Sequence, residues 1–370
     1  MISCLETMSF SRIDRMLGLW LKIFAILVFI SALLFLFWNN NNKYFNNDNT
    51  TSQEKRFDRI MTYLDNLSAQ VEKLVQQQAV SDAKTSAPQQ KESSIEHIEL
   101  FEKFIADIQN VSQIQHLVPL DTLLTTLKFM IYDVDEYDPA LVEFVRGLIH
   151  LPSDRSKLNL TDSTRKDLSQ MGQSKKIDAM LSSQRDGFFV EAGAFDGESL
   201  SNSLFFELER NWTGLLIEPV PTLHQSIVSR RRHCYSINAC IAEKKPTVAK
   251  FKVFDVYSGR ENDMSQFHLA RINFFDTASQ RQTAFIPCFS LNTIMRALNR
   301  TRIDYFSLDV EGAEIHILKA IDYKNLDIRS FSIEWSSSNE TMPLIKSLLA
   351  SNNYTLESED MLDLYYKKKL

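Results

Sequence analysis

The sequence lacks the basic charge and the sequence bias that mark several familiar classes of protein. Its 370 residues carry a formal net charge of -6 and a pI near 5.7, whereas a nucleic-acid-binding domain usually has a clustered basic face and a high pI. Glycine and proline number only nine each, so low-complexity disorder is not the main theme. We therefore expect no nucleic-acid partner, and a content of 44% hydrophobic residues allows a sizeable core.

Cysteine is also scarce. The sequence holds four cysteines, and none lies in a CxxC pair or in a Cys/His cluster at metal-binding spacing, so we predict no metal site. We favour a disulfide between Cys240 and Cys288, because one closes an expected strand and the other opens a nearby segment after Pro287. The alternative, in which both cysteines and Cys234 are reduced and buried, stays open because sequence does not give connectivity.

One long hydrophobic run is present at residues 17–38, which are apolar apart from one lysine and one serine. At about 1.5 Å per residue it is long enough for the roughly 30 Å hydrocarbon core of a bilayer, so we predict a transmembrane helix. Arg12 and Arg15 precede it, and the positive-inside rule then makes residues 1–16 a cytosolic tail and places the rest in the secretory lumen. A cleaved signal peptide is the alternative, although its apolar core is usually shorter.

Glycosylation motifs support this orientation, because Asn-X-Ser/Thr sites are modified in the secretory lumen. Eight such sites occur, more than the asparagine, serine and threonine content predicts by chance. We therefore expect a single-pass type II membrane protein of the endoplasmic reticulum, Golgi and endosomal system or of the plasma membrane. The first four sites begin at Asn49, Asn66, Asn110 and Asn159.

The segment after the predicted span is first polar and then helical. Residues 39–94 are expected to form a polar stalk, in which apolar residues three and four apart over 53–80 are typical of a short coiled coil. This helix either pairs with a second copy, giving a homodimer, or packs on its own globular domain. Residues 95–164 carry helical periodicity, with one helix beginning at Asp138 and Pro139, and this helical preamble is expected to dock on the main domain.

Strands and helices alternate over residues 165–370, which predicts a parallel sheet with helices on both faces. A strand is expected to end at Ile241, residues 248–257 are expected to be extended, and residues 258–282 give no interpretable pattern. The end of the chain, 354–357 and 361–367, is expected to close the sheet as an antiparallel pair. The predicted fold class is mixed α/β with a mostly parallel sheet.

Three acidic residues follow short apolar runs of the kind that form buried strands. The carboxyl ends of parallel strands share one edge of the sheet, and ligands bind outside that edge, so the three acids are expected to face one crevice. The runs and their acids are Phe188–Val190 with Glu191, Leu215–Ile217 with Glu218, and Tyr305–Leu308 with Asp309.

The motifs EAGAFDGESLSN, GLLIEP and DYFSLDVEGAEIHIL, in this order, resemble the FkbM-type methyltransferase domain, a class I methyltransferase-like (Rossmann-like) fold. The first motif departs from the dinucleotide fingerprint G-x-G-x-x-G, so a nicotinamide or flavin site is not expected. With the apolar span, the DPALVEFVR helix and the SQMGQ element (Ser169–Gln173), the chain also resembles the animal Star-like proteins. These are single-pass regulators of growth-factor trafficking in the secretory pathway.

The resemblance implies S-adenosylmethionine as the cofactor. It gives Gly193 and Gly197 the role of letting the backbone approach the cofactor, with Asp196 between them in the same cofactor-binding set. It places Glu191 near the methionine end and Glu218 at the ribose hydroxyls, for which a two-oxygen acceptor is suited. Structural hydrogen bonding by these two glutamates is the alternative.

The role of Asn238 is open to two interpretations. Its side chain either contacts the adenine or caps its own turn at the end of a strand.

Transfer of a methyl group to a hydroxyl needs alignment and a base. Asp309 is the first candidate, because carboxylates crowded beside Glu311 and Glu314 can hold one another's pKa up. Glu334 is the second candidate. In the alternative, Glu311 only helps to start a helix, since acids favour helix amino ends.

Two functions therefore stand side by side. In the first, as the Star-like resemblance implies, the lumenal domain is a binding module that escorts membrane-bound growth-factor precursors from the endoplasmic reticulum. In the second, it is an active S-adenosylmethionine-dependent O-methyltransferase that acts on a glycan, a lipid or a small molecule.

Overall fold

All residues that the computed structural model describes belong to the second of the chain's two units, Glu92–Leu370; they are 118–253, 258–260, 282–335 and 341–369. Within this part of the chain, no helix is long and apolar enough to cross a membrane. The span predicted at 17–38, the stalk helix predicted at 53–80 and the first three glycosylation sites lie outside the described residues. The fourth site, Asn159, lies on the exposed surface.

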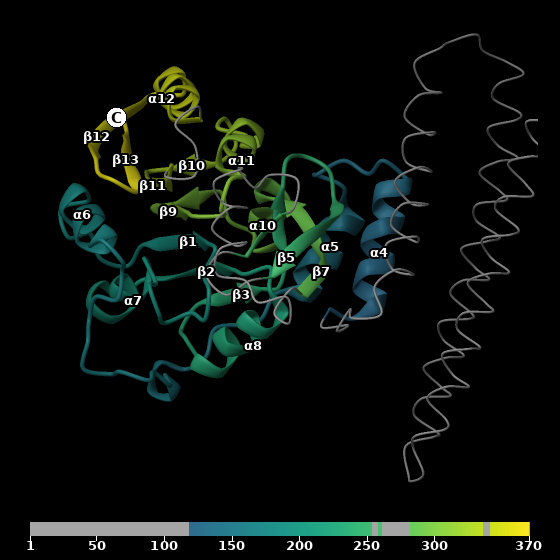
Figure 1. The fold of residues 1–370 in the computed structure, drawn as a ribbon, viewed down its shortest axis with the longest axis horizontal. Coiled ribbons are helices and arrows are strands. Elements are labelled where there is room, and N and C mark those ends of the chain that lie inside the picture. The colour runs from purple at the N-terminus through teal and green to yellow at the C-terminus, as the bar shows by residue number, and fades with distance from the viewer. Residues whose placement is uncertain (1–117, 254–257, 261–281, 336–340, 370) are drawn as a thin grey trace, which may run out of the picture. The chain divides into compact units, whose positions relative to one another are not determined.

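A seven-stranded sheet forms the centre of the described fold (Figure 1). In spatial order its strands are β12 (Tyr354–Glu359), β13 (Asp363–Lys368), β11 (Ser330–Glu334), β9 (Tyr305–Leu308), β1 (Phe188–Ala192), β2 (Thr213–Ile217) and β3 (Tyr235–Ile237). The pairings from β11 to β3 are all parallel, while β13 runs antiparallel to both of its neighbours. The predicted mostly parallel α/β fold is confirmed, and its order is that of a doubly wound sheet with one antiparallel strand inserted.

Helices cover both faces of this sheet because its central strands, such as β1, are buried on both sides. Phe188 and Val190 of β1 belong to one hydrophobic core and Phe189, between them, belongs to another, as the alternation of side chains along a strand requires. The first core contains residues of α5 (Pro139–Leu148), α10 (Leu291–Ala297), α11 (Glu314–Ala320) and α12 (Thr341–Ser351). The second contains residues of α6 (Gln173–Met180), α7 (Leu204–Arg210) and α8 (Pro221–Arg230).

Helix α5 begins where the sequence predicts. The side chain of Asp138 accepts a 2.8 Å hydrogen bond from the backbone N–H of Ala140, and Pro139 occupies the first helical position. The helix then packs on α10, where Arg146 Nε donates a 2.9 Å hydrogen bond to the carbonyl of Ala297. This part of the helical preamble is thus attached to the sheet domain.

A second, smaller sheet was not expected. It has the order β4 (Cys240–Ala242), β7 (Gln282–Ser290), β5 (Thr247–Val253) and β6 (Gly259–Arg260), and α4 (Leu120–Ile131) packs on it. The single strand predicted to end at Ile241 is wrong, because β3 and β4 lie in different sheets. The chain turns between them at Asn238, whose side-chain amide donates hydrogen bonds to the carbonyls of Glu218 and Pro219 at 2.8 and 2.9 Å.

The remaining described elements are short. They are the 3-10 turn η2 (Arg155–Lys157) and a parallel pair of two-residue strands, β8 (Arg302–Ile303) and β10 (Asp327–Ile328).

Candidate functional site

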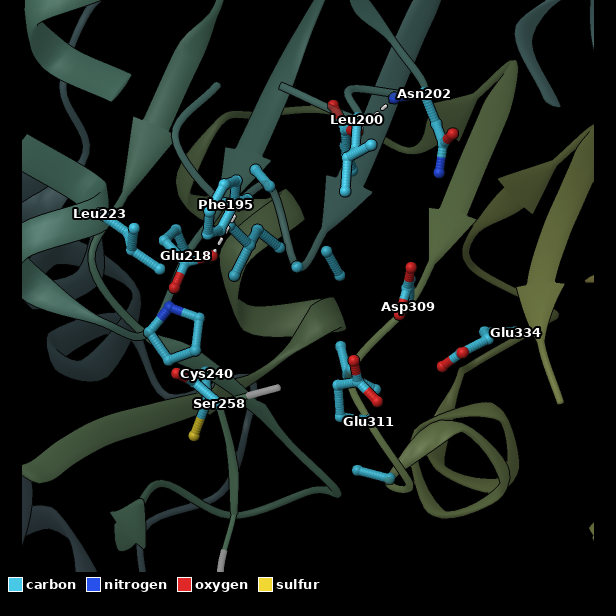
Figure 2. A pocket seen from close by; sticks show the side chains of 18 of the residues that line it. Phe195, Leu200, Asn202, Glu218, Leu223, Cys240, Ser258, Asp309, Glu311 and Glu334 are labelled. Carbon is cyan, nitrogen blue, oxygen red and sulfur yellow. Dashed lines mark hydrogen bonds between the residues drawn. The ribbon is translucent and has the colours of Figure 1, made fainter. Parts of the chain in front are cut away.

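A cavity of about 200 Å³ lies at the carboxyl ends of β1, β2 and β9. Its position is the switch point of the sheet, where chain order reverses on either side of β1 and where open α/β sheets bind ligands. Glu191 lines it. Glu218, Asp309, Glu311 and Glu334 also line it (Figure 2). Among its described lining residues, five are acidic and one, Arg260, is basic, so the cavity favours cationic or hydroxyl-bearing groups over anionic ones.

The loop after β1 fits beneath β9 only because Gly193 has no side chain. A Cβ atom at this position would lie 1.8 Å from the carbonyl oxygen of Asp309, and the backbone has a φ of +83°, which side-chain-bearing residues rarely adopt. The amide of Gly193 also donates a 3.0 Å hydrogen bond to the carbonyl of Ile217 at the end of β2. Gly193 therefore holds three strand ends together at the edge of the cavity.

Asp196 and Gly197 lie in the same loop but do not line the cavity. The Asp196 carboxylate accepts hydrogen bonds from the backbone amides of Glu198 and Ser199 at 2.9 and 2.6 Å and pairs with Arg230 at 3.1 Å. Gly197, with a φ of +77°, packs against a side chain of α8. Both residues are placed where they shape the turn, and the predicted contact with a cofactor stays a prediction.

Glu191 is buried and both of its carboxylate oxygens are occupied. One accepts a 2.6 Å hydrogen bond from the backbone amide of Asn202, and the other accepts bonds from the hydroxyls of Ser201, at 2.9 Å, and Ser203. Burial raises the pKa of Glu191, while the nearby guanidinium of Arg232 and these hydrogen bonds act in the opposite direction. Glu191 thus fixes the 201–203 turn at the cavity wall, in agreement with the structural alternative.

Glu218 is 4% exposed and reaches the cavity from the end of β2. One oxygen accepts a 2.9 Å hydrogen bond from the backbone amide of Phe195 and the other a 2.8 Å bond from that of Val220. Burial raises the pKa of Glu218 to about 8, because the effect of lost hydration is larger than the opposite effect of the two backbone hydrogen bonds. Above this pKa the ionised carboxylate has about four lone-pair sites, so each oxygen can then accept one more hydrogen bond from a hydroxyl group in the cavity.

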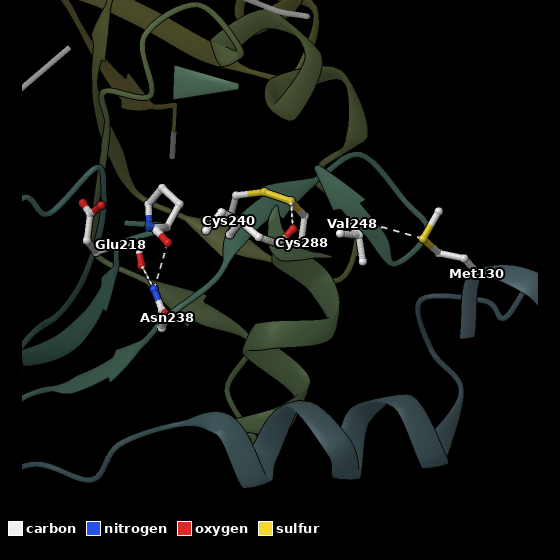
Figure 3. The surroundings of a disulfide bond; sticks show 8 residues. Met130, Glu218, Asn238, Cys240, Val248 and Cys288 are labelled. Atoms are coloured by element: carbon white, nitrogen blue, oxygen red, sulfur yellow. Dashed lines mark hydrogen bonds between the residues drawn. A yellow bond between two sulfur atoms is a disulfide. The ribbon is translucent and has the colours of Figure 1, made fainter. Parts of the chain in front are cut away.

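Asn238 does not line the cavity. Its amide is engaged by the two carbonyls beside Glu218 (Figure 3). Of the two interpretations, the structure therefore favours the turn cap over an adenine contact, and Asn238 acts by holding the segment that carries Glu218.

The opposite side of the cavity is strongly acidic. Asp309, Glu311 and Glu334 each place a carboxylate oxygen within 4.8 Å of the others. Loss of hydration and the neighbouring charge of Glu334 raise the pKa of Asp309 well above its usual range. Asp309 lines the cavity, which is the position that a base needs in order to reach the acceptor (Figure 2).

Glu314 lies behind this cluster and is structural. Its carboxylate accepts hydrogen bonds from the backbone amides of Val310 and Gly312 at 3.0 to 3.2 Å, so it holds the turn that precedes α11. Burial, followed by repulsion from Glu334, raises its pKa to about 8. Glu311 has a left-handed φ of +60°, and such strain in a non-glycine residue is concentrated at functional sites.

Among the described residues, the carboxylates of Asp309, Glu311 and Glu334 form a group that could hold a metal ion. Their oxygens are of the kind that Mg²⁺ and Ca²⁺ prefer, and three of them would form part of a coordination shell. Cys/His spacing in the sequence does not indicate this group, because its members are carboxylates that come from β11 and the loop after β9.

A disulfide links two neighbouring strands of the second sheet, next to the cavity. Cys240 and Cys288 are register partners on the parallel strands β4 and β7 and are bonded to each other, which is the pairing favoured from the sequence (Figure 3). Cys240 also lines the cavity. Cys234 is free and buried, and burial raises the pKa of its thiol.

The structure adds residues to the site that no motif singled out for this role. Gln170 and Gln173, from the SQMGQ element, and Leu362, from the turn before β13, line the cavity on the side away from Glu218. The sequence does not identify these residues, because glutamine and leucine residues in loops form no motif that is typical of a binding site. They are also far in the sequence from the acidic motifs that they approach in the fold.

These features define the class of the domain. Residues 191–356 match the family model described as "Methyltransferase FkbM domain", so this part of the chain is a methyltransferase-like domain. No curated protein matches the chain.

Three solved structures match parts of the chain at low identity and low TM-score. A precorrin-6y C5,15-methyltransferase from Geobacter metallireducens GS-15 is 12% identical and covers 58% of this chain and 96% of its own, with a TM-score of 0.29. A fibrillarin/Nop5p complex is 12% identical and covers 53% and 83%, with a TM-score of 0.26. An antibiotic-related methyltransferase is 12% identical and covers 56% and 97%, with a TM-score of 0.23.

Proposed function

We propose that the domain binds S-adenosylmethionine in the cavity and transfers its methyl group to a hydroxyl. The observation that carries this proposal is the convergence of Glu218, Gly193 and Asp309 on one cavity at the switch point of the sheet. Glu218 offers two acceptor oxygens to vicinal hydroxyls, and the absent side chain of Gly193 leaves the wall open. The surplus of carboxylates suits a ligand that carries a positive charge.

The chain's own residues divide the work. When bound, the cofactor supplies an electrophilic methyl group. Glu218 holds the hydroxylated part of the ligand, while Glu191 and Arg232 keep the 201–203 turn in place. Asp309 would take the proton from the acceptor hydroxyl, whose oxygen would receive the methyl group supplied by the bound cofactor, so that the acceptor becomes a methyl ether and S-adenosylhomocysteine is left. Glu334 beside Asp309 raises the basicity of Asp309.

Titration calorimetry tests cofactor binding directly. Full-length chain purified in detergent is expected to bind S-adenosylmethionine and S-adenosylhomocysteine at one site. Absence of heat at millimolar cofactor would remove the enzymatic proposal.

A trafficking role is the second proposal, and it is supported by the sequence: the apolar run at 17–38, the eight glycosylation motifs and the Star-like resemblance. In this proposal the chain is a type II membrane protein of the secretory pathway that escorts membrane-bound growth-factor precursors, with a stalk that forms a homodimer. A glycosidase would shrink the protein on a gel if its domain is lumenal. Co-purification of a growth-factor precursor with wild-type chain and equally with Glu218→Gln would separate cargo binding from cofactor binding.

A further inference from the structure

The wall of the cavity opposite Glu218 is made by two segments outside the family match, 169–173 and 360–363. Gln173 joins them: its Oε1 accepts a 2.8 Å hydrogen bond from the backbone amide of Met171, and its Nε2 donates a 2.8 Å bond to Asp363. The first segment also pairs with the glycine loop through a bridge between Ser169 and Leu200. The two segments and residue 200 therefore form a continuous rim around this side of the cavity.

This rim is apolar on its outside. Met171 is 46% exposed, Leu200 is 44% exposed and Met361 is 78% exposed, which makes them three of the eight most exposed large hydrophobic residues among those described. Leu200 itself lines the cavity, and each methionine is next to a lining residue, Gln170 or Leu362. Leu200 also holds a left-handed φ of +60°, a conformation that costs free energy in a residue with a branched side chain.

The interior of the cavity next to this rim is acidic. Asp309, Glu311 and Glu334 line the cavity, and Arg260 is the one basic residue in its described lining. In their ionised form these carboxylates would repel a phosphate or carboxylate head group. A neutral hydroxyl can instead donate a hydrogen bond to a carboxylate, and it is also the group from which Asp309 is placed to take a proton.

We propose that the methyl acceptor is a neutral amphiphile: a hydroxyl-bearing head enters the acidic cavity while a long apolar chain lies across Met171, Leu200 and Met361. This inference rests on the proposed function and narrows its acceptor to a lipid-like alcohol. It assigns the 169–173 and 360–363 segments the role of selecting the acceptor, because they supply Gln170, Gln173 and Leu362 to the cavity lining and the exposed Met171 and Met361 to the rim.

Photolabelling tests this assignment without requiring turnover. Full-length chain in phosphatidylcholine nanodiscs would be irradiated with a diazirine-bearing 16-carbon primary alcohol, and the labelled peptides would be mapped by mass spectrometry. A diazirine-bearing four-carbon alcohol is the matched probe without the long chain. Saturable labelling of 169–173 and 360–363 by the long alcohol, competed by unlabelled hexadecanol, is expected. Equal labelling by the short alcohol, or labelling that does not saturate, would overturn the inference.

Substitution of the rim gives a second readout. Met171→Ser combined with Met361→Ser is expected to lower saturable labelling about tenfold, because exposed thioether side chains that a long chain would cover have been removed. Leu344→Ser, at a residue that is 51% exposed on α12 and does not line the cavity, is the control and should leave labelling unchanged. Equal labelling of the double variant and wild type would contradict the inference.

Cofactor binding separates the two proposals. Calorimetry with S-adenosylmethionine on the same samples should give wild-type affinity in the Met171→Ser, Met361→Ser double variant. If wild type binds the cofactor but not the long alcohol, the acceptor inference fails and the proposed function stands. If it does not bind the cofactor, the proposed function fails, and the acceptor inference that rests on it fails too.

Discussion

Gly193 and Asp309 touch backbone to backbone: a Cβ added to the glycine would lie 1.8 Å from the aspartate's carbonyl oxygen. The two residues follow β1 and β9, which are adjacent parallel strands. Their contact sets how closely the ends of these strands approach, and therefore where the Asp309 side chain stands relative to the loop that carries Phe195. A Cβ atom added at Gly193 would force the loop after β1 away from β9. It would therefore move Asp309, the proposed base, away from the loop that is proposed to contact the cofactor.

Gly193→Ala should therefore destabilise the domain by about 3 kcal/mol or more, since it adds a backbone clash to an unfavourable φ. Thermal unfolding measures this. Gly147→Ala is the matched control, because a Cβ at that exposed position of α5 would have no atom within 4 Å. It should have an unchanged or slightly raised unfolding temperature. Equal unfolding temperatures for the two variants would show that the close approach is not present.

The pKa of Glu314 predicts a pH dependence of stability. Burial raises this pKa from 4.5 to about 8, so the folded state holds a proton that the unfolded state has released between these values. The contribution of Glu314 to the free energy of unfolding is fully present below pH 4.5. It is lost as pH rises toward 8, at up to about 1.4 kcal/mol per pH unit. Glu314→Gln should lose less stability than wild type over this range.

Unfolding temperatures of wild type and Glu314→Gln between pH 5 and 8 would check this. The exposed substitution Glu357→Gln, on β12, serves as the control and should follow wild type. Parallel curves for Glu314→Gln and wild type would mean that Glu314 titrates normally.

The sequence predicted those parts of the fold whose residues repeat a local pattern. The runs before Glu191, Glu218 and Asp309 are strands in parallel order, and their acids share one cavity because parallel strands end at the same edge. The second sheet was missed for local reasons. Strand β7 contains Pro287, which argues against a central strand, and β3 and β4 are only three residues each.

The candidate site was predicted in position but only partly in role. Sequence shows that Glu191 ends a strand, but it cannot show that Ser201, Asn202 and Ser203 fold back to occupy both carboxylate oxygens. The wall formed by Gln173 also depends on a contact with a residue 190 positions away. Such long-range contacts leave no periodic signal.

Asp309→Asn tests the proposed base. An amide cannot accept the proton, so methyl transfer should fall by about a hundredfold or more, while cofactor affinity changes little. In wild type the rate should rise with pH as the raised pKa of Asp309 is passed, and the variant should lose this rise. Radiolabel transfer from S-adenosylmethionine to an alcohol acceptor measures both. An unchanged pH profile in Asp309→Asn would assign the base elsewhere.

The cysteines give a chemical test of the second sheet. In denaturant without reductant, alkylation should modify Cys234 and spare Cys240 and Cys288, which should react only after reduction. Cys240→Ser with Cys288→Ser should lower stability by about 2–4 kcal/mol, because the bond closes a long loop. Peptide mapping reads out the first result, and alkylated Cys288 in the unreduced sample would contradict the disulfide.

The affinity of Glu218→Gln for S-adenosylmethionine tests the central claim most directly. The substitution keeps the size of the side chain and one acceptor oxygen but removes the carboxylate that is proposed to hold the ribose hydroxyls. Titration calorimetry of full-length chain should show one site in wild type and in Glu357→Gln, and an affinity at least about tenfold weaker in Glu218→Gln. Equal affinities in all three proteins, or no binding to wild type, would contradict the account.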